Sequence, residues 1–217
     1  MSEDVKDRIK RVETIYGDYY DSLQVVRDRI QNNILQYQRQ VMETTDEKYF
    51  EHLSVRIKTD ESMREKCRRK GLPETARSAL HELKDSIGIR IVCPFINDVY
   101  DMVETIRGFD NCRVVEEKDY IRHVKDNGYR SYHMIVVVET EFPDVLGRTP
   151  GQYFVEIQIR TIAMDTWASL EHRMKYKKNI PNQELLVAEL KRCADELASC
   201  DLTMQTIKEL IDAAEDE

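Results

Sequence analysis

Three polar side chains alternate with apolar ones in the segment YFVEIQIR. Glu156, Gln158 and Arg160 occupy every second position, and side chains two residues apart on a β-strand point to the same face of a sheet. A carboxylate, an amide and a guanidinium on one face can form the floor of a polar pocket. The neighbouring apolar run MIVVV favours a central position for this strand. A half-exposed strand gives the same pattern, so both interpretations stay open.

A second carboxylate, Asp85, stands just before the apolar segment SIGIRIVC. If this segment pairs with the strand of Glu156, the two carboxylates can meet. Two carboxylates suffice for Mg²⁺ when substrate phosphates complete its coordination. An aspartate before a strand is also typical of a turn. Strict alternation places Asp85 and Arg90 on opposite faces unless Gly88 forms a bulge.

Basic side chains gather between Arg56 and Lys70, where seven basic residues accompany three acidic ones. Arg56 and Lys58 lie on one side of an expected strand end, and Lys66 and Arg69 are three apart on an expected helix. Such an array can bind a triphosphate, with arginine as a fork and lysine as a point charge. A solvated charged helix face is the alternative.

Composition limits the classes of protein that fit. The chain has 217 residues, 41% of them apolar, and a net charge of −8, which suits one domain with helical extensions and argues against a protein that coats nucleic acid. No run approaches the ~18 apolar residues of a membrane span, and the N-terminus is too charged for a signal peptide. We therefore expect a cytoplasmic protein without a membrane partner or a stable nucleic-acid partner. The five cysteines form no C-x-x-C pair, which favours free thiols.

The expected elements mix helices and strands. Apolar residues in steps of three and four predict one long amphipathic helix over 9–41 and another over 186–211. Strands are expected at 49–58, 86–95, 112–117, 132–139 and 153–160, and further helices at 59–70, 73–83, 96–107 and 161–177. This order predicts an α/β (α+β) fold, a mixed sheet of about five strands with helices packed on it. Residues 143–152 are expected to form a hairpin loop.

The common nucleotide-binding and hydrolase motifs are absent from the sequence. It contains neither the P-loop pattern G-x-x-x-x-G-K-[ST] nor the dinucleotide pattern G-x-G-x-x-G. None of the five histidines is followed by aspartate, as the His-Asp pair of a metal-dependent phosphohydrolase requires. A phosphate site in this chain must therefore be built differently.

Four segments taken in order resemble the synthetase domain of the RelA/SpoT family, over about Tyr49 to Tyr176: VRIKTDESMREKCRRKG, DSIGIRIVC, KDYIRHVKDNGYRSYHMIV and VEIQIRTIAMDTWASLEH. In size the chain is similar to the small alarmone synthetases. The resemblance implies a nucleotidyltransferase-like fold and transfer of the β,γ-pyrophosphate of ATP to the 3′-hydroxyl of GTP or GDP. The products would be AMP and guanosine penta- or tetraphosphate, (p)ppGpp, the alarmone of the stringent response.

The resemblance also implies an organisation of the chain. It comprises a helical extension over 1–45, a synthetase domain over 46–178 and an acidic helix over 179–217. The hydrolase domain of the long family members does not fit in 217 residues, so synthesis without hydrolysis is expected. The resemblance to the small alarmone synthetases also implies a homotetramer.

Roles for individual residues follow from the matched motifs. The ATP phosphates would be bound by Arg56, Lys58, Lys66, Arg69 and Arg90. Asp85 and Glu156 would hold Mg²⁺, and Glu156 would also act as general base on the 3′-hydroxyl, which Gln158 orients. On the acceptor side, Tyr129 would stack on guanine and Asp165 would face the base, where many relatives have asparagine. The acceptor phosphates would be neutralised by Lys125, His133 and Arg160.

Two other functions remain open at this point. A pyrophosphokinase of the same fold can act on adenine nucleotides or on the 3′ end of tRNA, although residues 181–217 carry ten acidic and three basic side chains, which argues against tRNA. A non-catalytic module that binds guanine nucleotides is the other alternative, and the carboxylate pair argues against it. The segment EEKDY pairs Glu116 with Lys118 and mixes two family variants, so GTP and GDP both stay possible as acceptors.

Overall fold

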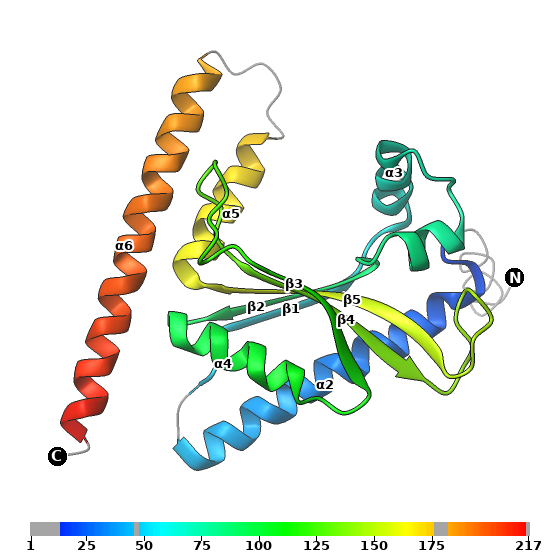
Figure 1. The fold of residues 1–217 in the computed structure, drawn as a ribbon, viewed down its shortest axis with the longest axis horizontal. Helices are drawn as coiled ribbons and strands as arrows, with labels where there is room; N and C mark the ends of the chain where they lie inside the picture. Colours follow the sequence, from blue (N-terminus) through cyan, green and yellow to red (C-terminus); the bar gives the residue numbers. More distant parts are fainter. Residues whose placement is uncertain (1–13, 46–47, 176–181, 216–217) are drawn as a thin grey trace, which may run out of the picture.

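A twisted sheet of five strands forms the centre of the molecule (Figure 1). The computed structural model describes residues 14–45, 48–175 and 182–215. The sheet order is β1-β2-β5-β4-β3, with β2 and β5 parallel and the other neighbours antiparallel. This confirms the predicted mixed sheet and the central place of the strand that carries Glu156. The strands are β1 (His52–Ile57), β2 (Ile87–Cys93), β3 (Cys112–Asp119), β4 (Tyr132–Thr140) and β5 (Gly151–Thr161).

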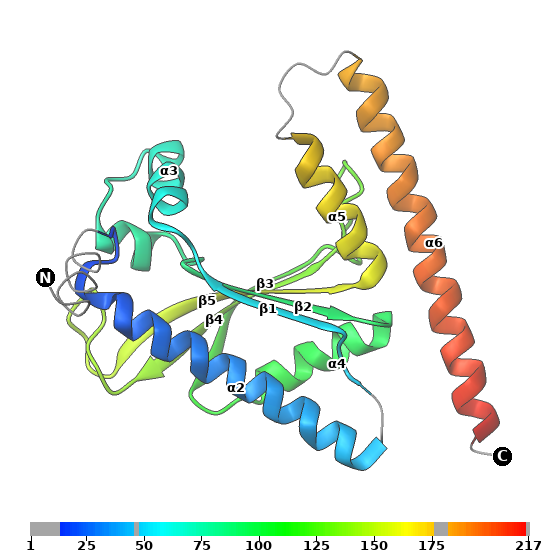
Figure 2. The same cartoon turned by 180° about the vertical axis from the view of Figure 1, so that it is seen from behind.

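Helices cover both faces of the sheet. Helices α2 and α4 pack on one face of the sheet, while α3 and α5 lie on the other (Figure 2). Helix α6 runs beside α5 at the edge of the molecule. Among the described residues no helix is long and apolar enough to cross a membrane. The helical elements are η1 (Gly17–Tyr19), α2 (Tyr20–Thr45), α3 (Asp60–Lys70), η2 (Ser78–Glu82), α4 (Ile96–Arg107), α5 (Ile162–Lys175) and α6 (Gln183–Glu215).

The main core lies between the sheet and the layer of α2 and α4. Along β2, Ile87, Ile89 and Ile91 are buried and alternate with Gly88 and Arg90, which are only partly buried. The buried residues of α2 follow one another in steps of three and four, as its amphipathic sequence predicts. They are Leu23, Val26, Ile30 and Ile34. Because the apolar side chains turn to this layer, the opposite face of the sheet is left polar.

The helix predicted over 9–41 differs from the structure at its start. Within the described residues it begins only at Tyr20, after the short turn η1, and it then extends to Thr45. Gly17 has a φ of 52°, which a right-handed helix does not accommodate. The positions Ile9 and Val12 of the predicted helix lie outside the described residues. Gly17, which stands inside an otherwise regular series of apolar positions, is the sequence feature that marks this late start of the helix.

The helix predicted over 73–83 is also shorter than expected. Its regular part is η2, which follows a loop that starts at Pro73. Thr75 accepts a hydrogen bond from the backbone N–H of Ser78 at 3.2 Å and so begins the turn. Leu83 is extended and leads toward Asp85 and β2. The other predicted elements occur with small shifts at their ends, and 141–150 form the expected connection between β4 and β5.

Candidate active site

The register of the strands gathers the predicted site residues in two rows. In the first row, Arg56 of β1 lies opposite Gly88 of β2, which lies opposite Glu156 of β5. In the second, Arg90 pairs with Gln158, and Gln158 pairs with His133 of β4. Pairing is regular on both sides of β2, so Gly88 forms no bulge. Asp85 precedes the strand, and alternation therefore does not force it away from Arg90.

A pocket of about 110 Å³ opens above these rows. A Cβ built on Gly88 would meet no atom within 4 Å, so this glycine forms an open part of the floor. The side chains around it carry both charges: three cations and one carboxylate. The lining residues are Ser54, Arg56, Lys58, Gly88, Ile89, Arg90, Glu156 and Gln158.

Asp85 lies next to this pocket and is shared by two lysines. Its Oδ2 accepts hydrogen bonds from the ammonium groups of Lys58 and Lys66. Its Oδ1 is buried and has no hydrogen-bond partner. Burial acts to raise the pKa of the Asp85 carboxyl, but the two ammonium groups outweigh it and lower that pKa. Burial lowers the pKa of Lys58. Two cations on one carboxylate leave a positive excess, which suits phosphates.

Helix α3 positions Lys66 through local signals in the sequence. Thr59 caps the helix by accepting from the backbone N–H of Ser62 at 3.3 Å, and Gly71 ends it in the left-handed conformation at a φ of 68°. The buried Met63 and Cys67 hold the helix against the core. Arg69 lies on its exposed side and is not among the residues that line the pocket.

Arg160 organises the other half of the site. It is 4% exposed, and its Nη2 donates to the Tyr129 hydroxyl at 2.6 Å and to Gln158 Oε1 at 2.8 Å. Its Nη1 donates to Asp165 Oδ1 at 3.1 Å, and its Nε donates to the buried Ser131 hydroxyl at 3.2 Å. All three guanidinium nitrogens are thus engaged by the protein. Arg160 thus holds this half of the site together, and its role in neutralising acceptor phosphates stays a prediction.

Tyr129 and His133 extend this network to Glu156. The Tyr129 hydroxyl is 2.7 Å from His133 Nε2, and His133 Nδ1 is 4.0 Å from Glu156 Oε1. Burial, followed by the positive charges of Arg160 and Lys125, lowers the pKa of His133 to about 3. The imidazole is therefore neutral near pH 7 and offers hydrogen bonds, not charge. Lys125 is exposed, with its Nζ 4.7 Å from the centre of the Tyr129 ring.

Asp165 joins the two halves of the site. Its carboxylate is 3.1 Å from Arg160 and 3.4 Å from Arg90, and its side chain is 25% exposed. It is therefore a counter-ion of two arginines, not a solvated helix aspartate. The sequence indicated its neighbourhood but not these partners, which come from two different strands.

Several contributing residues were not assigned a role from the sequence. Ser131, fully buried, accepts from Arg160 and donates to the carbonyl of Ile159 at 3.2 Å. Tyr120 places its ring edge-on to His133, with 5.2 Å between the ring centres. Ser131 and Tyr120 both stand inside the segment KDYIRHVKDNGYRSYHMIV, one of the four that carry the family resemblance. That segment was the signal for both residues.

Fold and site together define a class of protein: a mixed sheet whose polar face carries a pocket lined by three cations and a carboxylate, with the carboxylate of Asp85 beside it. A sequence model described as the region found in RelA / SpoT proteins matches residues 55–181. This chain belongs to the RelA/SpoT family. It is 41% identical over 162 residues to the GTP pyrophosphokinase YwaC of Bacillus subtilis (strain 168), a match that covers 75% of each chain.

Solved structures of the family share this architecture. Small alarmone synthetase 1 from Bacillus subtilis, bound to its product pppGpp, superposes with a TM-score of 0.70 at 30% identity, covering 89% of this chain and 94% of the other. The same synthetase bound to AMPCPP gives a TM-score of 0.65 at 28% identity, covering 90% and 94%. The likeness thus extends over nearly the whole of both chains.

Proposed function

We propose that this protein is a small alarmone synthetase, a GTP pyrophosphokinase that transfers the β,γ-pyrophosphate of ATP to the 3′-hydroxyl of GTP or GDP. AMP leaves, and guanosine penta- or tetraphosphate forms. The observation that carries this proposal is the row Arg56, Gly88 and Glu156, in which a cation and a carboxylate flank an open floor. The GTP pyrophosphokinase and alarmone synthetase names of its relatives agree with it.

The donor nucleotide occupies the pocket above Gly88. Its triphosphate is bound by Arg56, Lys58, Lys66 and Arg90, and Arg69 adds charge from the exposed side of α3. Pyrophosphoryl transfer demands alignment and charge neutralisation more than covalent chemistry from the protein. The positive excess around Asp85 supports this assignment.

Mg²⁺ fits the carboxylates of this site. Asp85 has an unpaired buried Oδ1 that is free to bind a cation, and Glu156 lines the pocket. Two carboxylates are enough for a Mg²⁺ whose coordination substrate phosphates complete. When bound, the ion would neutralise charge on the phosphates. Asp85 and Glu156 would hold it.

The acceptor guanine stacks on Tyr129, whose ring Arg160 and His133 hold by its hydroxyl. Glu156 accepts the proton of the 3′-hydroxyl. Gln158 orients that hydroxyl and also donates to the Glu156 carboxylate at 3.3 Å. Lys125 supplies charge for the acceptor phosphates, and neutral His133 supplies a hydrogen bond. Asp165 holds Arg90 and Arg160 in place by ion pairs and faces the guanine edge.

Assembly and cellular location complete the proposal. Along α6, Leu202, Met204, Ile207, Leu210 and Ile211 are all about half exposed or more, which supports assembly through this helix. We propose a homotetramer, as the resemblance to the small alarmone synthetases implies, and a cytoplasmic location. The extension 1–45, the synthetase domain 46–178 and the helix 179–217 remain its proposed parts.

The reaction is tested with ATP labelled at the β-phosphate. Incubation with GTP and Mg²⁺ is expected to move the label into guanosine pentaphosphate and to leave AMP unlabelled. Release of labelled inorganic pyrophosphate instead, without a labelled guanosine product, would contradict the proposed transfer.

A further inference from the structure

Helix α6 touches the loop of Tyr129 at one close contact. Gly128 has a φ of 88°, and a Cβ built on it would lie 2.6 Å from the Cβ of Ala194 on α6. Ala194 is itself 4% exposed. Both positions therefore need very small side chains, and the backbone next to Tyr129 rests directly on the helix.

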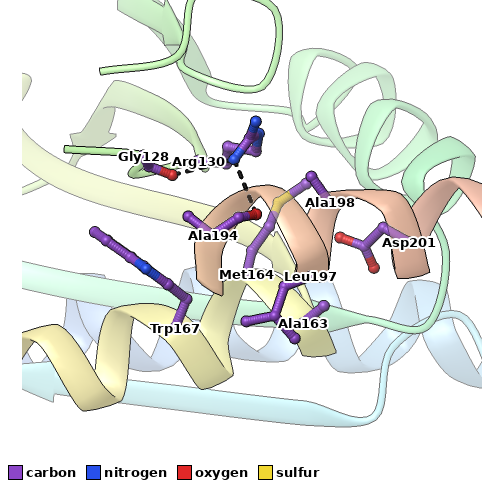
Figure 3. A pocket seen from close by; sticks show the side chains of 9 residues that line it. All are labelled: Gly128, Arg130, Ala163, Met164, Trp167, Ala194, Leu197, Ala198 and Asp201. Carbon is purple, nitrogen blue, oxygen red and sulfur yellow. Dashed lines mark hydrogen bonds between the residues drawn. The ribbon is translucent and has the colours of Figure 1, made fainter. Parts of the chain in front are cut away.

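Arg130 fastens this contact. Its Nη1 donates to the carbonyl of Ala194 at 3.1 Å and to that of Gly128 at 3.3 Å, the two bonds drawn in Figure 3. Its Nη2 donates to Asp195 Oδ1 at 3.2 Å. The neighbouring Tyr129, in contrast, directs its hydroxyl to Arg160 and His133 in the acceptor half of the site. Arg130 thus binds α6, while Tyr129 just before it binds Arg160 and His133.

Trp167 of α5 contacts both α6 and Tyr129. Its indole N–H donates to the carbonyl of Leu190 on α6 at 2.7 Å. Its ring packs edge-on against Tyr129, with 6.2 Å between the ring centres. A displacement of α6 would therefore reach Tyr129 through Trp167 as well as through Arg130.

A second anchor lies one residue beyond Arg160. The buried Thr161 donates its hydroxyl proton to Asp201 of α6 at 2.6 Å. Between the two anchors the cavity in Figure 3 measures only about 10 Å³. This is too small for a ligand and about the limit for one water. The interface is thus close-packed, which makes it a structural contact and not a binding pocket.

We propose that α6 is a positioning element of the acceptor half of the site, with Arg130 as the positioning residue that couples the helix to Tyr129. The inference rests on the proposed function and deepens it. All of α6 lies beyond residue 181, where the family match ends. A segment outside the matched region would therefore set the affinity for GTP, while the donor pocket over Gly88 stays unaffected.

The first test enlarges Ala194. Ala194→Leu is expected to raise the KM for GTP about tenfold, because small displacements of a binding group cost this much or more, and to leave the KM for ATP within about twofold. Trp167 is the single tryptophan, so its emission should shift to longer wavelength as the contact loosens. Ala188→Leu, on an exposed part of α6, is the matched control and should behave as wild type.

The second test removes the donors of Arg130 and keeps its stem. Arg130→Met should raise the KM for GTP in the same selective way and decides the matter if Ala194→Leu fails to fold. Arg192→Met is its control, because the partners of Arg192 within the described part of the chain are Glu189 and Glu196 of its own helix. A wild-type KM for GTP in a folded Arg130→Met, or equal rises for GTP and ATP, would overturn the inference.

Failure of the proposed function would look different. In that case the wild-type protein makes no guanosine product, and calorimetric titration with GTP and with AMPCPP replaces the kinetic readout. Selective loss of GTP affinity in Arg130→Met would then still uphold the positioning role of α6, and unchanged affinity would overturn it.

Discussion

Gly88 on β2 and Glu156 on β5 are register partners on neighbouring parallel strands, and the space above the glycine is open. Arg56 lies opposite the same glycine on its other side. A side chain at this position would therefore project between Arg56 and the proposed base Glu156. The absence of a side chain leaves open the space that we propose for the donor nucleotide.

Substitution of Gly88 should separate binding from stability. Gly88→Val is expected to abolish binding of AMPCPP, because its side chain fills the pocket. It should leave the melting temperature unchanged or slightly higher, because valine favours a strand and glycine costs conformational entropy on folding. Calorimetric titration and thermal unfolding measure the two effects.

Gly151 is the matched control for this substitution. A Cβ there would lie 2.3 Å from the carbonyl oxygen of Phe142, so Gly151→Val should lower the melting temperature. Tight AMPCPP binding by a folded Gly88→Val protein would show that the donor does not occupy the floor at Gly88.

Glu156→Gln tests the proposed base. The amide cannot take the proton of the 3′-hydroxyl, so kcat should fall by about 10²–10⁴-fold. Binding of GTP should be retained, because Tyr129 and its hydroxyl partners are unchanged. AMP formation and equilibrium binding are to be measured on the same preparation, and near-normal turnover would remove Glu156 from the role of base.

Tyr16→Phe tests how the N-terminal segment supports the donor site. The buried Tyr16 hydroxyl donates to the backbone carbonyl of Lys58 at 2.8 Å. Its loss should cost about 1 kcal/mol of unfolding free energy and raise the KM for ATP more than that for GTP. Tyr20→Phe on the following turn is the control. Equal KM values for ATP in wild type and Tyr16→Phe would mean that this bond does not position Lys58.

The pH dependence of the unfolding free energy should reveal the lowered pKa of His133. Its pKa is lowered from 6.5 to about 3 in the folded protein, so between these values the unfolded chain binds a proton that the folded chain does not. The unfolding free energy must therefore fall as pH decreases from about 6.5, by at most about 1.4 kcal/mol per pH unit.

His133→Asn should flatten this dependence between pH 6.5 and 4.5, a window above the range in which Asp85 titrates. Urea unfolding at several pH values measures it. Parallel curves for wild type and His133→Asn would show that the imidazole is not held neutral.

Local pattern predicted much of the site, and strand order accounts for what it missed. The shared face of Glu156, Gln158 and Arg160 follows from a period of two, which needs no knowledge of neighbours. That Asp85 binds both Lys58 and Lys66 depends on how β1, α3 and β2 are arranged in space, and no local pattern encodes this arrangement. The two arginine partners of Asp165 were missed for the same reason.

The helix predictions show the same division. Apolar steps of three and four predicted α2 and α6 correctly as long helices, because helical periodicity is local. The first of them begins only at Tyr20, after Gly17, and Tyr16 just before this glycine contacts Lys58 across 42 residues of sequence, a contact that no local pattern predicts. The contact of α6 with Gly128 likewise could not be predicted, because either apolar stripe could have packed on several surfaces.

The most direct test of this account is the product formed from ATP and Mg²⁺ with GTP, GDP, ATP alone or deacylated tRNA, separated by anion exchange with mass detection. We predict AMP together with guanosine penta- or tetraphosphate, and the better acceptor will settle the preference between GTP and GDP. AMP formed only with tRNA or an adenine acceptor, or no AMP in any mixture, would contradict the assignment as an alarmone synthetase.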